Sequence, residues 1–189
     1  MKPARPYTAS RLSYVLRASG LILVVGLTLL IALNSDWVAS FGSLGYAGAF
    51  LAMLASNATL ILPAPGLIIV FALGSSLNPV LVGLCAAFGA SLGELTGYIT
   101  GVSGLVVIEN TPAAHRIKYW MERNGALTIF TLSIFPNPFF DLAGLMAGAG
   151  KMPVWKFLTT AFLGKSIQSI MIALAGALSL GWVEQWLLH

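Results

Sequence analysis

Residues 126–150 read ALTIFTLSIFPNPFFDLAGLMAGAG, two short apolar arms on either side of a Pro-Asn-Pro break at 136–138. Proline lacks an amide hydrogen and its ring clashes with the preceding helical turn, so no straight helix is expected to run through Pro136 and Pro138. At 1.5 Å per residue, each helical arm reaches only about halfway through a hydrocarbon layer about 30 Å thick. The segment therefore predicts a re-entrant hairpin, which enters and leaves the membrane on the same side.

A similar pattern lies earlier in the chain, where residues 45–77 are apolar on both sides of Pro63-Ala64-Pro65. Pro63 recurs as Pro136 at an offset of 73, and Pro79 recurs as Pro153 at an offset of 74. Each hairpin precedes an apolar stretch long enough to cross the membrane, and these stretches are 79–101 and 154–180. A hairpin adds no crossing and the span after it adds one, so the sequence predicts two copies of one design in opposite orientations, an inverted repeat.

The composition is that of a membrane protein. Apolar residues make up 58% of the chain and charged residues 8%, with a mean hydropathy of +0.89, against about 45–50% and about 25% in soluble domains. An all-α integral membrane protein is therefore expected. The single cysteine, Cys85, excludes an intrachain disulfide and a cluster of cysteine metal ligands. No phosphate-binding loop and no Ser/His/Asp set is present, so we expect no enzyme activity, no metal and no cofactor.

The remaining segments complete the predicted topology. A polar segment, 1–17, precedes a transmembrane helix at 18–34, for which a signal peptide is the alternative because arginines lie before it. The membrane domain covers 45–181. Between its halves, residues 112–124 alternate charged and apolar side chains, which predicts an amphipathic helix on the membrane surface. The residues expected to face lipid headgroups there are His115, Arg116, Lys118 and Arg123.

Charge placement predicts the orientation. With a cytoplasmic N-terminus, all but one of the ten Lys and Arg residues fall on the cytoplasmic side, and the exception is Lys165. The formal net charge of +4 is thus explained by membrane orientation, and no nucleic acid partner is expected. The short loops suggest a prokaryotic cell membrane, with the endoplasmic reticulum as the alternative.

Three ionisable residues fall within the predicted membrane segments, namely Glu94, Asp141 and Lys165. An unpaired charge there costs roughly 2.5–3.5 kcal/mol, so each residue needs a partner or water. Asp141 follows the second break and Lys165 lies on the next span, so these two are expected to pair. Glu94 has no basic residue near it in the sequence. These residues are candidates for a role in transport. The alternative is that Asp141 and Lys165 form a structural pair that only ties the hairpin to the helix.

The proline breaks also free backbone polar groups at membrane depth, which is tolerated only where they line a cavity or are covered by protein. Asn57 lies in the first hairpin and Asn137 in the second break. Together with the three ionisable residues they predict a polar, hydrated groove between the two hairpins. Each asparagine has an alternative reading as a helix cap or turn residue.

Two motifs resemble a known family. They are Gly93-Glu94-Leu95-Thr96-Gly97-Tyr98, and FPNPFFDLAG at 135–144 followed by Pro153-x-Trp155-x-Phe157 and Gly164-Lys165. Both resemble the VTT domain of the DedA / SNARE-associated Golgi protein superfamily. The vacuole membrane protein branch is most similar, since its second hairpin carries the same Pro-Asn-Pro-x-x-Asp-x-Ala-Gly run. The resemblance covers roughly 45–178.

This resemblance implies two opposed re-entrant hairpins and movement of lipid between leaflets. Eukaryotic members are similar to energy-independent phospholipid scramblases, and bacterial members to proton-linked carriers of undecaprenyl phosphate. The bacterial branch typically has an acid in the first hairpin and arginines around the second. Here 66–77 contains no acid, and Ser133 and Phe139 stand where arginines would be expected.

The preferred hypothesis is a lipid scramblase or flippase for phospholipid or a polyprenyl-type lipid. The headgroup would pass Glu94, Asp141 and Lys165 while the acyl tails stay in the bilayer. One alternative is a proton- or ion-coupled secondary transporter of a small solute that uses Glu94 and Asp141 as a titrating pair. Another is a membrane-organising protein that transports nothing. A homo-oligomer remains open.

Overall fold

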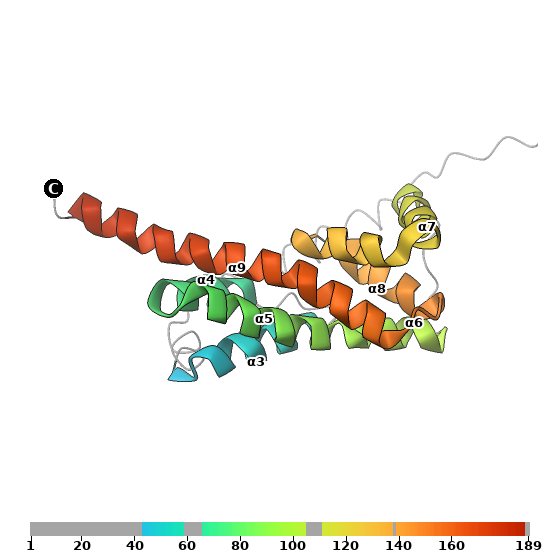
Figure 1. The fold of residues 1–189 in the computed structure, drawn as a ribbon, viewed down its shortest axis with the longest axis horizontal. Helices are drawn as coiled ribbons and strands as arrows, with labels where there is room; N and C mark the ends of the chain where they lie inside the picture. The colour runs from blue at the N-terminus through green and yellow to red at the C-terminus, as the bar shows by residue number, and fades with distance from the viewer. Residues whose placement is uncertain (1–42, 59–65, 105–110, 138, 188–189) are drawn as a thin grey trace, which may run out of the picture.

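The computed structural model describes residues 43–58, 66–104, 111–137 and 139–187, and every element within these ranges is an α-helix (Figure 1). The helices are α3 (Tyr46–Ala58), α4 (Gly66–Ser76), α5 (Pro79–Gly93), α6 (Leu95–Ser103), α7 (Pro112–Ile134), α8 (Phe139–Ala149) and α9 (Val154–Leu187). The predicted segments 1–17 and 18–34 lie outside the described residues, as do Pro63, Pro65 and Pro138.

Two long helices have the length and composition needed to cross a membrane, residues 79–103 and 154–179. They correspond to the two spans that the sequence predicts. The first consists of α5 and α6, which Glu94 joins with nearly helical backbone angles (φ −63°, ψ −14°). The Glu94 N–H donates to the Ala90 carbonyl, and the Glu94 carbonyl accepts from the Tyr98 N–H. The chain therefore crosses the α5–α6 junction with its helical hydrogen bonds largely intact.

The two long helices run antiparallel at the centre of the molecule (Figure 1). Gly83 of α5 faces Ile170 of α9. Further along α5, the Phe88 ring meets Phe162 edge-on, with 6.3 Å between ring centroids. Residue numbers rise along one helix while they fall along the other, which fixes the antiparallel direction.

Each long helix is accompanied by a helical hairpin. In the first hairpin, α3 and α4, the Ser56 hydroxyl accepts the Gly66 N–H at 3.0 Å near the tip, and Gly45 approaches Leu77 at the base. The second hairpin consists of the later part of α7 (125–134) and α8. Two short arms on either side of a proline break thus fold against each other in both halves of the chain.

α7 contains two predicted elements joined by a bend. Pro112 occupies the first turn, and the Thr111 hydroxyl caps the helix by accepting the Ala114 N–H at 3.2 Å. The helix then bends at Asn124, whose backbone is extended (φ −156°, ψ 86°) and whose side chain accepts the Leu127 N–H at 3.1 Å. The amphipathic segment 112–124 and the first arm of the second hairpin are therefore separate helical pieces.

The hairpins pack on the long helices in a reciprocal way. Each first arm lies on the long helix that follows it, α3 on α5 and the later α7 on α9. Each second arm lies on the long helix of the other half, α4 on α9 and α8 on α6. The two halves thus exchange one arm each.

Glycines make both exchanged contacts possible. A Cβ on any of these glycines would overlap backbone atoms of the facing helix, so the helices approach closely only without side chains there. The glycines are Gly74 and Gly176 between α4 and α9, and Gly148 and Gly101 between α8 and α6. Gly74 and Gly148 stand at an offset of 74, the same as Pro79 and Pro153.

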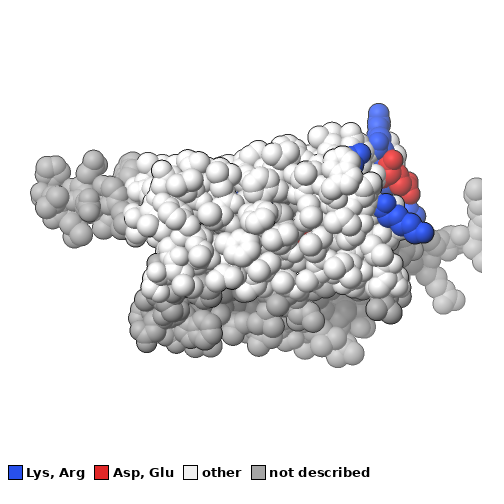
Figure 2. Space-filling model, turned by 60° about the horizontal axis from the view of Figure 1, so that its bottom comes forward, with Lys and Arg blue, Asp and Glu red and all other residues white. Residues whose placement is uncertain are grey.

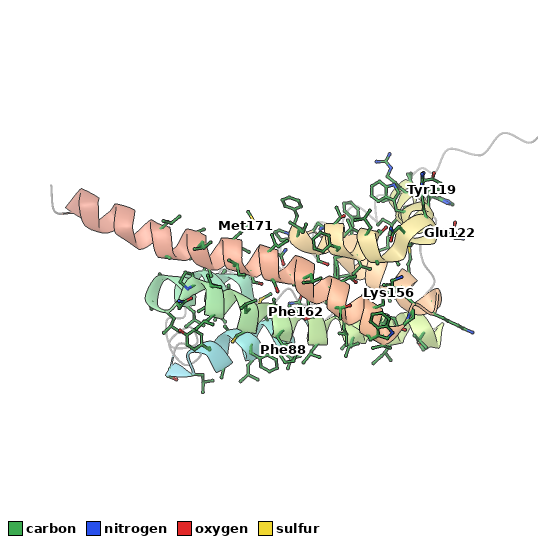
Figure 3. All side chains as sticks on the ribbon, in the orientation of Figure 1. Phe88, Tyr119, Glu122, Lys156, Phe162 and Met171 are labelled. Atoms are coloured by element: carbon green, nitrogen blue, oxygen red, sulfur yellow. The ribbon has the colours of Figure 1, made fainter. Side chains whose placement is uncertain are left out.

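The outer surface is largely apolar. Large side chains such as Ile99, Leu163 and Met171 are more than half exposed on the long helices, and Figure 3 shows Met171 pointing away from the bundle. On the face drawn in Figure 2, acidic and basic side chains gather at one end only. An apolar belt with charges at one end is typical of a protein surrounded by lipid.

Candidate functional site

A buried ion pair joins the two long helices. The Lys165 Nζ lies 3.0 Å from the Glu94 Oε1, and the two residues are only 7% and 5% exposed. Lys165 also donates to the Asn57 side-chain oxygen at 3.0 Å, and its Nζ lies 4.7 Å from the centre of the Phe140 ring. These four residues, called the central cluster below, come from four different places: α3, the α5–α6 junction, α8 and α9.

Glycines beside the two charges bring the hairpin arms close. Gly93, next to Glu94, faces the backbone of α3 at Leu54, Asn57 and Ala58, while Gly164, next to Lys165, faces Phe130 and Ser133 of α7. The Asn57 amide nitrogen donates to the Met53 carbonyl at 2.8 Å. That bond orients the side chain so that its oxygen accepts from Lys165.

The central cluster lies halfway along both long helices. Glu94 is near the middle of 79–103, and Lys165 is near the middle of 154–179. α3 ends at Ala58, which lies beside Gly93. α8 begins at Phe139, and the ring of the next residue, Phe140, lies against Lys165. The end of α3 and the start of α8 therefore lie beside the buried charges.

The structure gives Lys165 a different direct partner from the one expected. The sequence predicts a pair with Asp141, but the ion pair within 4 Å is with Glu94. Successive residues of a helix point about 100° apart, and in α8 it is Phe140 that faces inward, 2% exposed. Asp141 consequently points outward, and within the described chain no basic side chain lies within ion-pair distance of it.

Asn137 organises the turn of the second hairpin. Its amide nitrogen donates to the carbonyls of Leu132 and Phe135 at 2.8 and 2.7 Å, and its side-chain oxygen accepts the Phe139 N–H at 3.0 Å. It thereby satisfies backbone groups around the break that includes Pro136. The alternative reading of Asn137 as a turn residue is the one that the geometry supports.

The ion pair of the central cluster is buried, and the hydrated groove that the sequence predicts stays a prediction. Two cavities of about 740 and 470 Å³ lie along α7, and neither is lined by Glu94 or Lys165. Protein atoms cover the ion pair. Each of the two buried charges is therefore compensated by the other and not by water. Glu94 and Lys165 are therefore buried between the two halves.

Several further polar residues of α9 are buried beside Lys165, and the sequence reading missed them. Gln168 is 3% exposed and Ser169 is fully buried, and in the described part of the chain the Ser169 hydroxyl has no hydrogen-bond partner. Ser91 of α5 is also buried. The run GKSIQS at 164–169, set in an otherwise apolar span, is the signal that identifies the α9 residues.

The residues expected to face headgroups are exposed on the first part of α7. His115, Arg116 and Lys118 lie along the helix, and the Arg123 guanidinium donates to the Tyr119 hydroxyl at 3.4 Å. Lys118 makes a loose ion pair with Glu122, 3.9 Å apart, in which both side chains are about two-thirds exposed. Among the described residues, no three His, Cys, Asp or Glu side chains are placed to hold a metal ion.

Comparison with known proteins places the chain in a family. The sequence profile of the VTT domain matches residues 64–178. Vacuole membrane protein KMS1 of Arabidopsis thaliana is 32% identical over 105 residues, which are 50% of this chain and 24% of that protein. Vacuole membrane protein KMS2 of the same plant is 34% identical over 85 residues, 40% of this chain and 20% of that protein.

A vacuole membrane protein 1 homolog of Dictyostelium discoideum is 42% identical over 43 residues, 23% of this chain and 11% of that protein. The match thus spans a quarter or less of the length of these relatives. No solved structure matches the chain. The profile covers more than half of the chain and includes Glu94, Phe140 and Lys165, so this is a membrane protein that belongs to the VTT-domain family, and the curated relatives it resembles are vacuole membrane proteins.

Proposed function

We propose that this protein is a lipid scramblase, which lets phospholipid headgroups cross between leaflets along the seam between the two hairpins while the acyl tails stay in the bilayer. The observation that carries the proposal is the Glu94–Lys165 pair, buried near the middle of both long helices, beside the end of α3 and the start of α8. Ionisable residues at that depth mark substrate pathways in membrane proteins. The sequence holds no nucleotide-binding loop, and the movement we propose is downhill unless it is coupled to protons.

The proposal includes two re-entrant hairpins in an inverted repeat. Three observations support it: the long helices run antiparallel, the hairpin arms are exchanged between halves, and the glycine contacts recur at the offset of the repeat. Helical hairpins that stop at half the depth of a span are too short to cross a bilayer. Their tips then line the path near the midplane, as in inverted-repeat transporters.

The chemistry of a zwitterionic headgroup matches the central cluster. Breaking the ion pair alone would leave two buried charges without partners, at a cost of several kcal/mol. A headgroup with a phosphate and an amine replaces both partners at once, since its phosphate pairs with Lys165 and its amine with Glu94. The Phe140 ring, already against a cation, suits a quaternary ammonium as well.

The proposed location is a eukaryotic internal membrane. The curated relatives are vacuole membrane proteins of a plant and an amoeba. This favours a eukaryotic membrane over the prokaryotic cell membrane that the short loops suggest.

Reconstitution tests the proposal directly. Purified protein is placed in liposomes that carry a fluorescent phosphatidylcholine, and a membrane-impermeant reductant is added outside. Scrambling exposes inner-leaflet lipid, so fluorescence falls below the level reached in protein-free liposomes. The exposed-pair variant Glu122→Gln serves as the control and retains the wild-type rate, while Glu94→Gln slows it.

The same liposomes separate the alternatives. If lipid exchange is no faster than in protein-free liposomes but a small solute is taken up, the protein is a secondary transporter. Neither lipid exchange nor solute uptake, from protein that is folded and inserted, would indicate a membrane-organising role. Either result removes the scramblase proposal.

A further inference from the structure

A second polar feature lies at the charged end of the molecule, away from the central cluster. A cavity of about 740 Å³, called the α7 cavity below, opens between the first part of α7, the end of α8 and the α8–α9 turn. Its volume is within the range of small-molecule sites, about 300–1,000 Å³. Figure 3 shows two of its charged side chains, Glu122 from α7 and Lys156 from α9, at this end.

The charges of the α7 cavity favour an anion. Lys118, Lys156 and His115 line it together with one acid, Glu122. The contact between Lys118 and Glu122 is long, 3.9 Å, and both side chains are largely exposed, so it holds Lys118 weakly. Among the described residues, Lys156 has no acidic partner. Two lysines are thus available to a ligand.

The inner wall of the α7 cavity is apolar. Met121, Met146 and Met152 line it, together with alanines and glycines of α7 and α8. Methionine side chains are flexible and polarizable, so they adapt to irregular apolar ligands. The exposed lysines and the less exposed methionines of this lining match a ligand with an anionic head and an apolar body.

The cavity wall is fixed by the core. The Tyr98 hydroxyl donates to the Met152 carbonyl at 2.5 Å, and the Tyr98 ring packs on Phe157 with 5.1 Å between centroids. Tyr98 lies one turn after Glu94 on the first long helix. The turn that carries Met152 is therefore held in place before any ligand arrives.

We propose that the α7 cavity binds the headgroup of an anionic phospholipid, with Lys118 and Lys156 on the phosphate and the three methionines against the glycerol and the first acyl carbons. The site is separate from the seam between the hairpins, and the proposal does not depend on lipid movement. The bound lipid stays in the leaflet at the charged end of the molecule.

Calorimetric titration tests the proposal. Short-chain phosphatidylglycerol is titrated into the purified protein in neutral detergent. Saturable binding is expected, weakened about tenfold or more in the double variant Lys118→Gln/Lys156→Gln, because two charge-assisted contacts are lost. The matched control Arg116→Gln/Lys151→Gln removes the same charge from α7 and from the turn without touching the cavity lining. It is expected to bind within about twofold of wild type.

Three results would overturn the proposal. Equal weakening in both double variants would indicate general charge attraction. Inorganic phosphate binding as tightly as the lipid would indicate a free-phosphate site. Phosphatidylcholine binding as tightly would remove the requirement for an anion. The Glu94→Gln variant tests whether the two sites are independent. If its lipid exchange is slowed but it still binds phosphatidylglycerol, the two sites act independently.

Discussion

Lys165 is a buried cation with three partners from three other helical segments. Glu94 neutralises it, the Asn57 side-chain oxygen accepts a hydrogen bond from it, and the face of the Phe140 ring lies against it. Removing one partner of a buried ion pair leaves the other charge uncompensated. Replacing both with apolar residues of similar volume is often neutral or stabilising. A single and a double substitution of the pair therefore differ in their effect on stability, and comparing them separates a role in stability from a role in transport.

We expect Glu94→Gln to destabilise the folded protein by about 3–5 kcal/mol, because it leaves Lys165 buried without a counter-charge. The double variant Glu94→Leu/Lys165→Met is expected to recover most of that loss while lipid exchange stays low. Thermal unfolding in detergent and the liposome measurement report the two quantities. A double variant that recovers both would indicate that the pair only ties the helices together.

The other membrane acid is expected to behave differently. Asp141 is exposed and has no basic contact within the described chain, so Asp141→Asn leaves no buried cation unpaired and is expected to lower the free energy of unfolding far less than Glu94→Gln does. Thermal unfolding of Asp141→Asn and of Glu94→Gln in the same detergent compares the two acids. A loss as large as that of Glu94→Gln would assign Asp141 a partner in the intact protein.

At the scale of elements, close helix crossings hold the exchanged arms. Gly148 of α8 faces the backbone of α6 so closely that a Cβ would overlap the Tyr98 carbonyl. Gly144, one turn earlier on the same helix, has only an ordinary contact with Phe157 at 3.8 Å. The two glycines share their helix and their burial but differ in the space beside them.

Gly148→Ala is therefore expected to force α8 away from α6 and to destabilise the protein by about 1–3 kcal/mol. Gly144→Ala keeps the packing and gains helix propensity, so its unfolding temperature is expected to be unchanged or higher. Thermal unfolding of both variants in the same detergent measures the difference. Equal unfolding temperatures would show that α8 and α6 are not in close contact.

At the scale of the whole molecule, the two hairpins approach the central cluster from opposite ends of the antiparallel helices. The base of the first lies at Gly45 and Leu77, beside the start of α5, while the second returns at the start of α9. If both are re-entrant, their bases face opposite sides of the membrane. The charged end in Figure 2 belongs to the second base.

Single cysteines test this arrangement. In a Cys85→Ser background, Ser76→Cys at the first base and Ala149→Cys at the second are both at exposed positions. An impermeant maleimide added outside sealed vesicles is expected to label one of them, and to label the other only after the vesicles are opened. Labelling of both from the same side would contradict opposed hairpins.

The amino-acid sequence alone predicts where the helices of the described residues lie and which family the chain belongs to. Proline breaks, apolar runs and helix caps act through neighbouring residues, so the arms around Pro136, the long helices and the bend near Asn124 follow from local chemistry. The sequence also located the buried charges Glu94 and Lys165 and the polar Asn57. The turn role of Asn137 was one of two readings that its local surroundings allowed.

Only the tertiary structure decided which of these groups meet. The partner of Lys165 depends on which helices cross at the same depth and on which side of α8 faces inward, and a rotation of one residue exchanges Phe140 for Asp141. The burial of the ion pair is equally a result of packing between segments far apart in the chain. Pairing of buried charges is a long-range property, because it depends on distances between helices and not on the spacing of residues within one.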